Sequence, residues 1–504
     1  MPKPARYKEI ERKYDVDDST VSPSFDGIAA IGRVEHAPTE HLDAVYFDTP
    51  GQDLARNKVT LRRRTGGTDA GWHLKLPAGA DARTEVRLPL DGTAQDTVPA
   101  DLVDVVLAIV RDRPLAPVAR ISTTREVQLL YTPDGRRLAE FCDDRVRAYR
   151  TGATAPTEQR WREWELELLG DPDDPKGSAE VLTRVGNRLL DAGAQSAAAG
   201  SKLARVLDDP DAEAQPEIEF SDPVHRAIAE QVGELVIWDR AVRADAYDSV
   251  HQMRVITRKL RSLLKESEES FGLTDDSWVL DELRQLAAIL GVARDAEVLA
   301  EKYQTSLDAL PAELIRGPVR ERLVDGARRR YDLGLRRSLA AMRTTRYFRL
   351  LDALEALASA EPVTTEHGEE PAPVTIDAAY KRVRKAAKVA HEAQTAEGLG
   401  VEERDEALHR IRKGAKRLRY TASATGEPKV SDAAKTIQTL LGDHQDSVVS
   451  RTHLSQQAEA AHAAGEDTFT YGVLYQHEDD LAQAARSRLD AALHALAKAV
   501  RKAT

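Results

Sequence analysis

Cysteine is nearly absent from this chain of 504 residues, in which Cys142 is the single one. One cysteine excludes an intrachain disulfide and any cysteine-based zinc site, and it fits a reducing cytoplasm. Long hydrophobic runs are also missing, because no stretch approaches the roughly 18 apolar residues that span a bilayer. The first residues lack the apolar segment of a secretory signal. We therefore expect a cytoplasmic protein with no membrane partner.

Basic residues are missing from one short segment, residues 207–222, which carries a net charge of −7 out of −12 for the chain. The segment holds two prolines and has no helical or strand periodicity, which favours an extended linker. The sequence therefore predicts two domains, at 1–206 and 223–504. The expected fold class is α+β, because the first domain has strand patterns and the second has helical ones.

Residues 1–206 alternate polar and apolar side chains between turn signals such as DTPGQD and TGGTDAG, which predicts an antiparallel sheet. Charged side chains share one face of each predicted strand, and apolar side chains share the other. We expect the apolar face to pack outward against helices. Its predicted members are Leu61, Trp72, Leu74, Leu76, Trp164, Leu166 and Leu168.

The charged faces are sorted by sign, with acids on the strands at 9–13 and 163–167 and bases at 62–64 and 73–75. A solvated sheet face is the simpler interpretation of any one strand. Several such strands together suit a site where carboxylates hold a hard cation, Mg²⁺ or Mn²⁺, while Lys and Arg hold phosphate oxygens. The pattern indicates phosphoryl transfer to water.

The ordered segments EIERK, YFDTPGQDLARNKVTLRRR, HLKLP, ELEL and the SK at 201–202 resemble the CYTH superfamily of triphosphate tunnel metalloenzymes, over about residues 5–206. The resemblance implies an eight-stranded antiparallel tunnel that binds a triphosphate and a divalent metal. It implies that metal is held by Glu9, Glu11, Glu165 and Glu167. It implies that phosphate oxygens are held by Lys13, Arg62, Arg64, Lys75, Arg120 and Lys202. Either Asp143 or Asp144 would add a further carboxylate.

The second region repeats itself, because HQMRVITRKLR at 251–261 and HRIRKGAKRLR at 409–419 match each other. Each is followed by a second shared element, LGVARDAEV or LGDHQDSVV. A tandem duplication with halves near 223–359 and 375–504 is expected, joined by the proline- and glutamate-rich segment 361–373. Helical halves of this length predict two four-helix bundles.

Three predicted helices each carry a stripe of basic side chains at steps of three and four residues, with no acid in the stripe. Acids at i,i+4 would accompany the bases on an ordinary solvated face, whereas like charges there are mildly destabilising without an anion. The stripes contain His251, Arg254, Arg258, Arg261 and Lys265; His409, Arg412, Lys416 and Arg419; and Lys381, Arg384, Lys388 and His391. The region resembles the CHAD domain over about 220–504, which implies that these residues bind inorganic polyphosphate.

Three functions remain open at this point. The first is a metal-dependent hydrolase of inorganic triphosphate or a related polyphosphate, and the second is a polyphosphate-binding protein without turnover. The third is adenylate cyclase or nucleoside triphosphatase activity in the tunnel. A nucleic-acid partner is disfavoured because aromatics are only 5% of the residues and none lies within the stripes to stack bases. Sequence alone selects neither the preferred metal nor the oligomeric state.

Overall fold

The structure is a computed structural model that forms two compact units. Unit 1 comprises Met1–Glu266, Asp276–Leu283 and Leu339–Glu361, and unit 2 comprises the other segments, Ser267–Asp275, Arg284–Ser338 and Pro362–Thr504. The described residues are 5–79, 81–90, 97–152, 158–169, 175–207, 223–266, 271, 273, 277–360, 375–395 and 400–503. The predicted linker at 207–222 lies outside them except for Leu207, and so does the predicted connector at 361–373.

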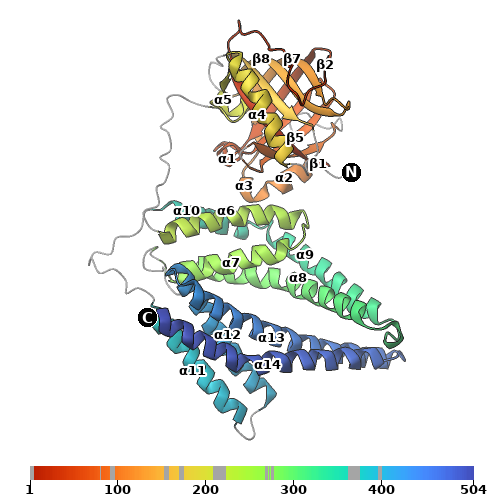
Figure 1. Cartoon of the computed structure of the whole chain (residues 1–504), viewed down its shortest axis with the longest axis vertical. Helices are drawn as coiled ribbons and strands as arrows, with labels where there is room; N and C mark the ends of the chain where they lie inside the picture. The colour runs from red at the N-terminus through yellow and green to blue at the C-terminus, as the bar shows by residue number, and fades with distance from the viewer. Residues whose placement is uncertain are drawn as a thin grey trace, which may run out of the picture. The chain divides into compact units, whose positions relative to one another are not determined.

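A closed antiparallel barrel dominates unit 1 (Figure 1). Among the described residues its eight strands follow the order β1-β6-β5-β4-β3-β7-β8-β9, and β9 pairs back with β1 to close it. Strands β2 and β10 add short pairings to β7 and β1. The strands are β1 (Ala5–Val16), β2 (Arg33–His36), β3 (Glu40–Asp48), β4 (Thr60–Thr65), β5 (Gly71–Pro77), β6 (Ala82–Leu88), β7 (Ala116–Tyr131), β8 (Arg137–Arg150), β9 (Gln159–Leu168) and β10 (Gln195–Ser196).

The barrel carries its apolar side chains outside, as the alternation predicted. All seven residues of the predicted apolar face are buried. One group packs with α2 and α3, where Leu102, Val106 and Ile109 complete the core. The other packs with α4, through side chains that include Leu182 and Val185. Because the apolar faces of the strands are buried against helices outside the barrel, the charged faces line its interior.

The helices of unit 1 and unit 2 together with the barrel confirm the expected α+β fold class. The helices in and around the barrel are α1 (Asp53–Arg56), α2 (Ala100–Val105), α3 (Leu107–Val110), α4 (Pro175–Asp191) and α5 (Lys202–Leu207). Those of the helix-rich region are α6 (Pro223–Arg243), α7 (Ser249–Glu266), α8 (Trp278–Ala309), α9 (Gly326–Ala341), α10 (Thr345–Ser359), α11 (Ile376–Thr395), α12 (Val401–Ala424), α13 (Pro428–Ala463) and α14 (Phe469–Ala503).

Helix α5 packs on the inner face of the barrel near one end. Its Leu203 and Val206 lie in one apolar cluster with Tyr46 and Ile121, from the inner faces of β3 and β7. This packing buries the first residue of α5, Lys202, against the charged interior. A short apolar helix thus delivers one lysine to the inside of the barrel.

Unit 1 also includes α6, α7 and α10, although they follow the barrel in sequence. Arg243 of α6 pairs with Asp104 of α2 at 3.1 Å, and it also pairs with Asp239 at 2.6 Å. Tyr347 of α10 donates a hydrogen bond to Asp239 at 2.8 Å. These buried polar contacts satisfy one another, which favours one fixed packing of α6 and α10.

Unit 2 contains α11 to α14, which share a core that includes Val383, Ile411 and Ile437. A second core brings α8 together with α13 and α14, through side chains such as Tyr303 and Leu454. The helices of the two sequence halves therefore share apolar contacts within this unit.

Candidate functional site

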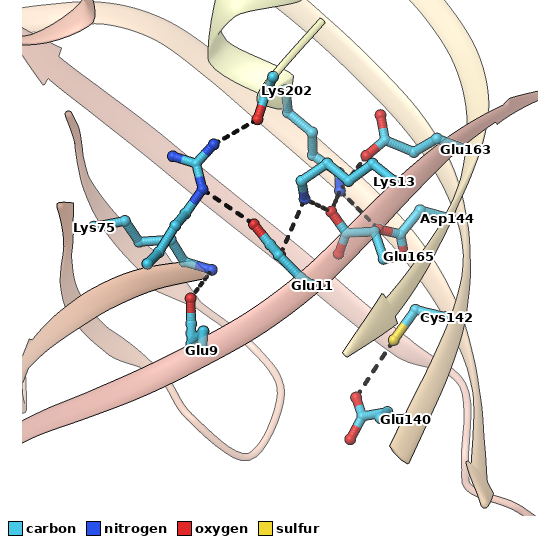
Figure 2. Close-up of polar contacts among 12 residues, drawn as sticks. Glu9, Glu11, Lys13, Lys75, Glu140, Cys142, Asp144, Glu163, Glu165 and Lys202 are labelled. Carbon is cyan, nitrogen blue, oxygen red and sulfur yellow. Dashed lines mark hydrogen bonds and ion pairs between the residues drawn. The ribbon is translucent and has the colours of Figure 1, made fainter. Parts of the chain in front are cut away.

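The barrel interior holds a cavity of about 360 Å³. Among the described residues that line it, nine are basic and seven are acidic. Nine of the ten tunnel residues expected from the sequence lie on its wall: Glu9, Glu11, Lys13, Arg62, Arg64, Lys75, Glu165, Glu167 and Lys202. The charged faces of separate strands thus meet in one chamber, parts of which Figure 2 shows.

Arg120 is the exception, and its expected place in the tunnel is corrected here. Alternate residues of β7 face the interior, and Arg125 lines the cavity while Arg120, five positions earlier, is exposed on the outer face. Arg125 instead pairs with Asp144 at 2.7 Å and with Glu165. An odd separation along a strand reverses the face, so Arg125 replaces Arg120 in the site.

Of the two candidate acids on β8, only Asp144 reaches the interior group. Asp143 faces outward and pairs with Arg162 at 2.6 Å, and it accepts a hydrogen bond from Ser22. Asp144 is fully buried and pairs with Lys202 at 2.8 Å. The structure therefore places Asp144, and not Asp143, among the interior carboxylates.

A row of carboxylates crosses three strands of the cavity wall. Glu11 of β1 lies directly opposite Glu167 of β9, which lies directly opposite Glu140 of β8. Like charges directly opposite each other on a sheet are destabilising unless a cation intervenes. Glu11 pairs with Lys13 at 3.3 Å, whereas the Glu167 carboxylate has no hydrogen bond or ion pair to the described residues.

The pKa values of these acids differ accordingly. Burial, together with the neighbouring Glu9, raises the pKa of Glu167 to about 7. Burial opposes the ionisation of Glu11 as well, but Lys13 and Lys75 outweigh it and lower its pKa to about 2. At Glu167, Lys75 only partly offsets the effects of burial and Glu9, and a divalent ion would supply the ion pair that Glu167 lacks among the described residues.

A second acidic cluster already contains a cation. Asp144, Glu163 and Glu165 place one oxygen each within 4.8 Å of one another, close enough to share a metal ion. The Lys202 ammonium lies among them, at 2.8 Å, 2.7 Å and 2.8 Å (Figure 2). The ammonium has three hydrogens, one for each carboxylate. The attraction of the carboxylates outweighs the effect of burial and raises the pKa of Lys202. Lys202 occupies the centre that a metal would need in this cluster.

Guanidinium groups crowd together on the opposite part of the wall. Arg62 donates a hydrogen bond to Tyr46 at 3.2 Å, and Arg64 pairs with Asp69. Burial, with Arg62 and Arg125 nearby, lowers the pKa of Arg64 to about 10 despite the Asp69 carboxylate. The neighbouring guanidiniums thus disfavour the charged form of Arg64, and a bound anion would offset this repulsion.

The basic stripes of the helical region lie on three helices. The α7 stripe belongs to unit 1, and the stripes of α11 and α12 belong to unit 2. Apolar side chains on the other side of α7 and α12, such as Met253 and Ile411, are fully buried. The stripe residues His251, Arg254, Arg261, His409, Arg412, Lys416 and Arg419 are half-buried, and Arg258, Lys265, Lys381, Arg384, Lys388 and His391 are exposed.

Cation crowding also occurs along α12. Burial and the nearby Lys413 lower the pKa of His409, with Arg412 acting in the same direction. The buried Nε atoms of Arg261 on α7 and Arg412 have no hydrogen-bond partner among the described residues. These groups are donors that an anion would satisfy.

Comparison with known protein families confirms the resemblances to CYTH and CHAD domains. A CYTH domain model matches residues 7–191, and a CHAD domain model matches residues 226–455. The uncharacterized proteins MT2285 and Rv2226 of Mycobacterium tuberculosis are each 65% identical over 516 residues, covering 100% of this chain and 99% of theirs. The chain belongs to the family of proteins that join a CYTH domain to a CHAD domain.

Solved structures match parts of the chain at low identity. PptA from Streptomyces chartreusis is 19% identical, with a TM-score of 0.45, and covers 54% of this chain and 98% of its own. The CHAD domain from Ricinus communis is 22% identical, with a TM-score of 0.36, and covers 54% and 89%. HpAC1 from Hippeastrum, described as having a dominant triphosphatase activity, is 15% identical, with a TM-score of 0.23, and covers 40% and 94%.

The CYTH domain contains cavity residues beyond those that motif matching supplied. Arg83 and Arg87 line the cavity from β6, where they alternate with the buried Val86 side of the strand. Arg83 reaches Glu11 at 3.3 Å and donates a hydrogen bond to the Gly200 carbonyl. The RTEVRL alternation placed both arginines on the charged face, so the signal was present in the sequence.

None of the described helices of the CYTH–CHAD chain combines the length and hydropathy of a membrane span.

Proposed function

We propose that the CYTH domain is a metal-dependent triphosphatase that hydrolyses a phosphoanhydride bond of inorganic triphosphate or a related substrate. One observation carries the proposal: the same barrel cavity holds a row of carboxylates in which Glu167 has no ion pair among the described residues, and a group of guanidiniums close enough to lower the pKa of Arg64. A divalent metal complex of a triphosphate supplies both charges at once.

The residues of the site have distinct roles in this proposal. Glu9, Glu11 and Glu167 would hold Mg²⁺ or Mn²⁺, with Glu165 more closely tied to Lys13, Arg125 and Lys202. When bound, the ion would neutralise charge on the transferred phosphoryl group.

The basic wall acts on the substrate directly. Arg62, Arg64 and Arg125 hold phosphate oxygens, and Lys75, which pairs with Glu9 at 2.7 Å, lies where the two walls meet. Fixing the triphosphate between both walls aligns its terminal phosphorus with an attacking water, so no covalent nucleophile is required.

Phosphate release from inorganic triphosphate, ATP and long-chain polyphosphate, each with Mg²⁺ or Mn²⁺ and with EDTA, tests the proposal. We expect metal-dependent release of orthophosphate from at least one triphosphate. Cyclic AMP and pyrophosphate as the products from ATP would identify the alternative, an adenylate cyclase. Tight triphosphate binding without any product would identify a non-catalytic binding protein.

For the CHAD domain we propose that the three stripes bind inorganic polyphosphate. A linear polyanion matches lengthwise rows of Arg and Lys, and the unpaired Arg261 and Arg412 Nε atoms support an anionic ligand. Filter retention of labelled polyphosphate at increasing salt measures this binding, which should grow with chain length. A cytoplasmic location is part of the same proposal, because polyphosphate-binding surfaces and the single cysteine suit that compartment.

A further inference from the structure

An exposed aromatic side chain continues the charged inner face of β1. Tyr7 stands two residues before Glu9 and lies opposite Glu85 of β6 in the barrel register. Alternate residues share a face, so Tyr7, Glu9 and Glu11 point the same way. Tyr7 is nevertheless 51% exposed, whereas Glu9 is buried. The ring therefore stands at the end of the cavity wall, about 7 Å along the strand from Glu9.

Arg87 connects this ring to the proposed catalytic groups. Its guanidinium lies 5.1 Å from the Tyr7 ring centroid, and Arg87 also lines the cavity. The same guanidinium pairs with Glu85 and lies 3.3 Å from Glu9. Two carboxylates thus fix the arginine that supports the ring, so the position of the ring is tied to the acidic wall.

The surroundings of the ring are partly apolar as well. Leu169 lines the cavity and is 39% exposed, and the pairing of Ile10 with Leu168 places it beside Glu9. Inorganic triphosphate consists of phosphate groups alone and would use neither an aromatic face nor a leucine. An exposed tyrosine by itself is ordinary on a protein surface. Tyr7 differs because an anchored guanidinium backs it at the edge of a triphosphate-sized cavity.

We propose that Tyr7, supported by Arg87, stacks against the planar base of a nucleoside triphosphate whose phosphates enter the tunnel; this rests on the function proposed for the CYTH domain. A base has a π-face for the tyrosine ring and for the guanidinium plane. The residues that hold the phosphates lie further along the same strands. The preferred substrate class is therefore nucleoside triphosphate over inorganic triphosphate.

Steady-state kinetics with ATP and inorganic triphosphate test this in the full chain. Tyr7→Leu keeps an apolar side chain but removes the π-face, and Tyr7→Trp enlarges it. We expect the ratio of kcat/KM for ATP to kcat/KM for inorganic triphosphate to fall about tenfold in Tyr7→Leu, mainly through KM for ATP. The ratio should be kept or increased in Tyr7→Trp. Tyr149→Leu, at a 41% exposed tyrosine on the outer face of β8, is the matched control and should leave the ratio at its wild-type value.

An equal change for both substrates in Tyr7→Leu, or no change for either, overturns the stacking role. If the wild-type chain hydrolyses neither substrate, the triphosphatase proposal fails, and calorimetric binding in EDTA then decides the stacking separately. In that case, tighter binding of ATP than of inorganic triphosphate that Tyr7→Leu abolishes supports the inference. Equal affinities of wild type and Tyr7→Leu for ATP reject it.

Discussion

The tunnel and the helical stripes both concentrate basic residues, but they compensate the charge differently. In the tunnel most ammonium and guanidinium groups have carboxylates near them, and eight of the nine basic side chains on the described cavity wall are buried or half-buried. Along the stripes the acids are few, with Glu392 pairing with Lys388 of α11 at 3.8 Å, and every stripe side chain is half-buried or exposed. The tunnel therefore suits a ligand that brings both signs of charge, whereas the stripes suit a plain polyanion. Buried charges also interact more strongly and are screened less by salt.

The largest expected effect concerns the acidic row of the tunnel. Glu11→Gln should lower metal-dependent turnover by about 10³-fold, since it removes a charge on the proposed metal without removing volume. Phosphate release at saturating metal measures it, with Glu126→Gln, an exposed acid on the outer face of β7, as the control. Wild-type turnover in Glu11→Gln would exclude this carboxylate as a ligand.

Substitution of Lys202 tests which of the two acidic groups in the tunnel needs a metal ion. Lys202→Met leaves Asp144, Glu163 and Glu165 without their central cation, and it should cost about 3–5 kcal/mol of folding stability. Added Mn²⁺ should restore part of the loss, because three carboxylate oxygens within 4.8 Å of one another have then lost their lysine partner. Urea unfolding followed by the barrel tryptophans measures both effects.

Lys8→Met, at an exposed lysine on the outer face of β1, is the control for Lys202→Met. Equal stability of the two variants would show that Lys202 does not compensate the cluster.

The stripes should respond to charge reversal rather than to metal. Arg254→Glu combined with Arg412→Glu should weaken the binding of long polyphosphate by the full chain about 100-fold at moderate salt. The dependence of log affinity on log salt should also become shallower by about 2. Arg120→Glu with Arg147→Glu, on the exposed outer face of the barrel, is the matched control.

Duplex DNA and single-stranded RNA extend the test of the stripes. If the wild-type chain binds either of them as tightly as polyphosphate at matched charge and salt, the stripes are a general polyanion surface.

The smallest expected effect is the pH dependence of tunnel stability. The pKa of Glu167 rises from 4.5 to about 7 on folding, so the folded state binds this proton more tightly than the unfolded state. Stability should then fall as pH rises from about 4.5 to 7 and level off above that, by about 3 kcal/mol in the metal-free protein. Glu167→Gln should flatten this profile, and saturating Mg²⁺ should offset the loss at pH 8.

Urea unfolding at a series of pH values gives this profile, with Glu180→Gln on the exposed face of α4 as the control. A profile of the same slope in Glu167→Gln and in wild type would exclude Glu167 as its source.

Sequence alone determined which side chains share a face, because the alternation of a strand and the three-to-four step of a helix are local properties of the chain. That is why the apolar outer face of the barrel was predicted correctly. It is also why nine expected residues line one cavity. Arg120 was expected from the CYTH resemblance and not from the alternation, and its side chain lies exposed on the outer face.

Only the tertiary structure decided which charged groups meet. The register of the strands, the closure of the barrel and the packing of α5 all depend on contacts between residues far apart in sequence. The row from Glu11 through Glu167 to Glu140 exists because β9 pairs with both β1 and β8. Lys202 reaches its three acids because α5 packs on the inner face of the barrel. Tyr7 became informative through the guanidinium of Arg87 on its ring. Nothing within EIERK or SK specifies those neighbours, because they are set by how the barrel closes.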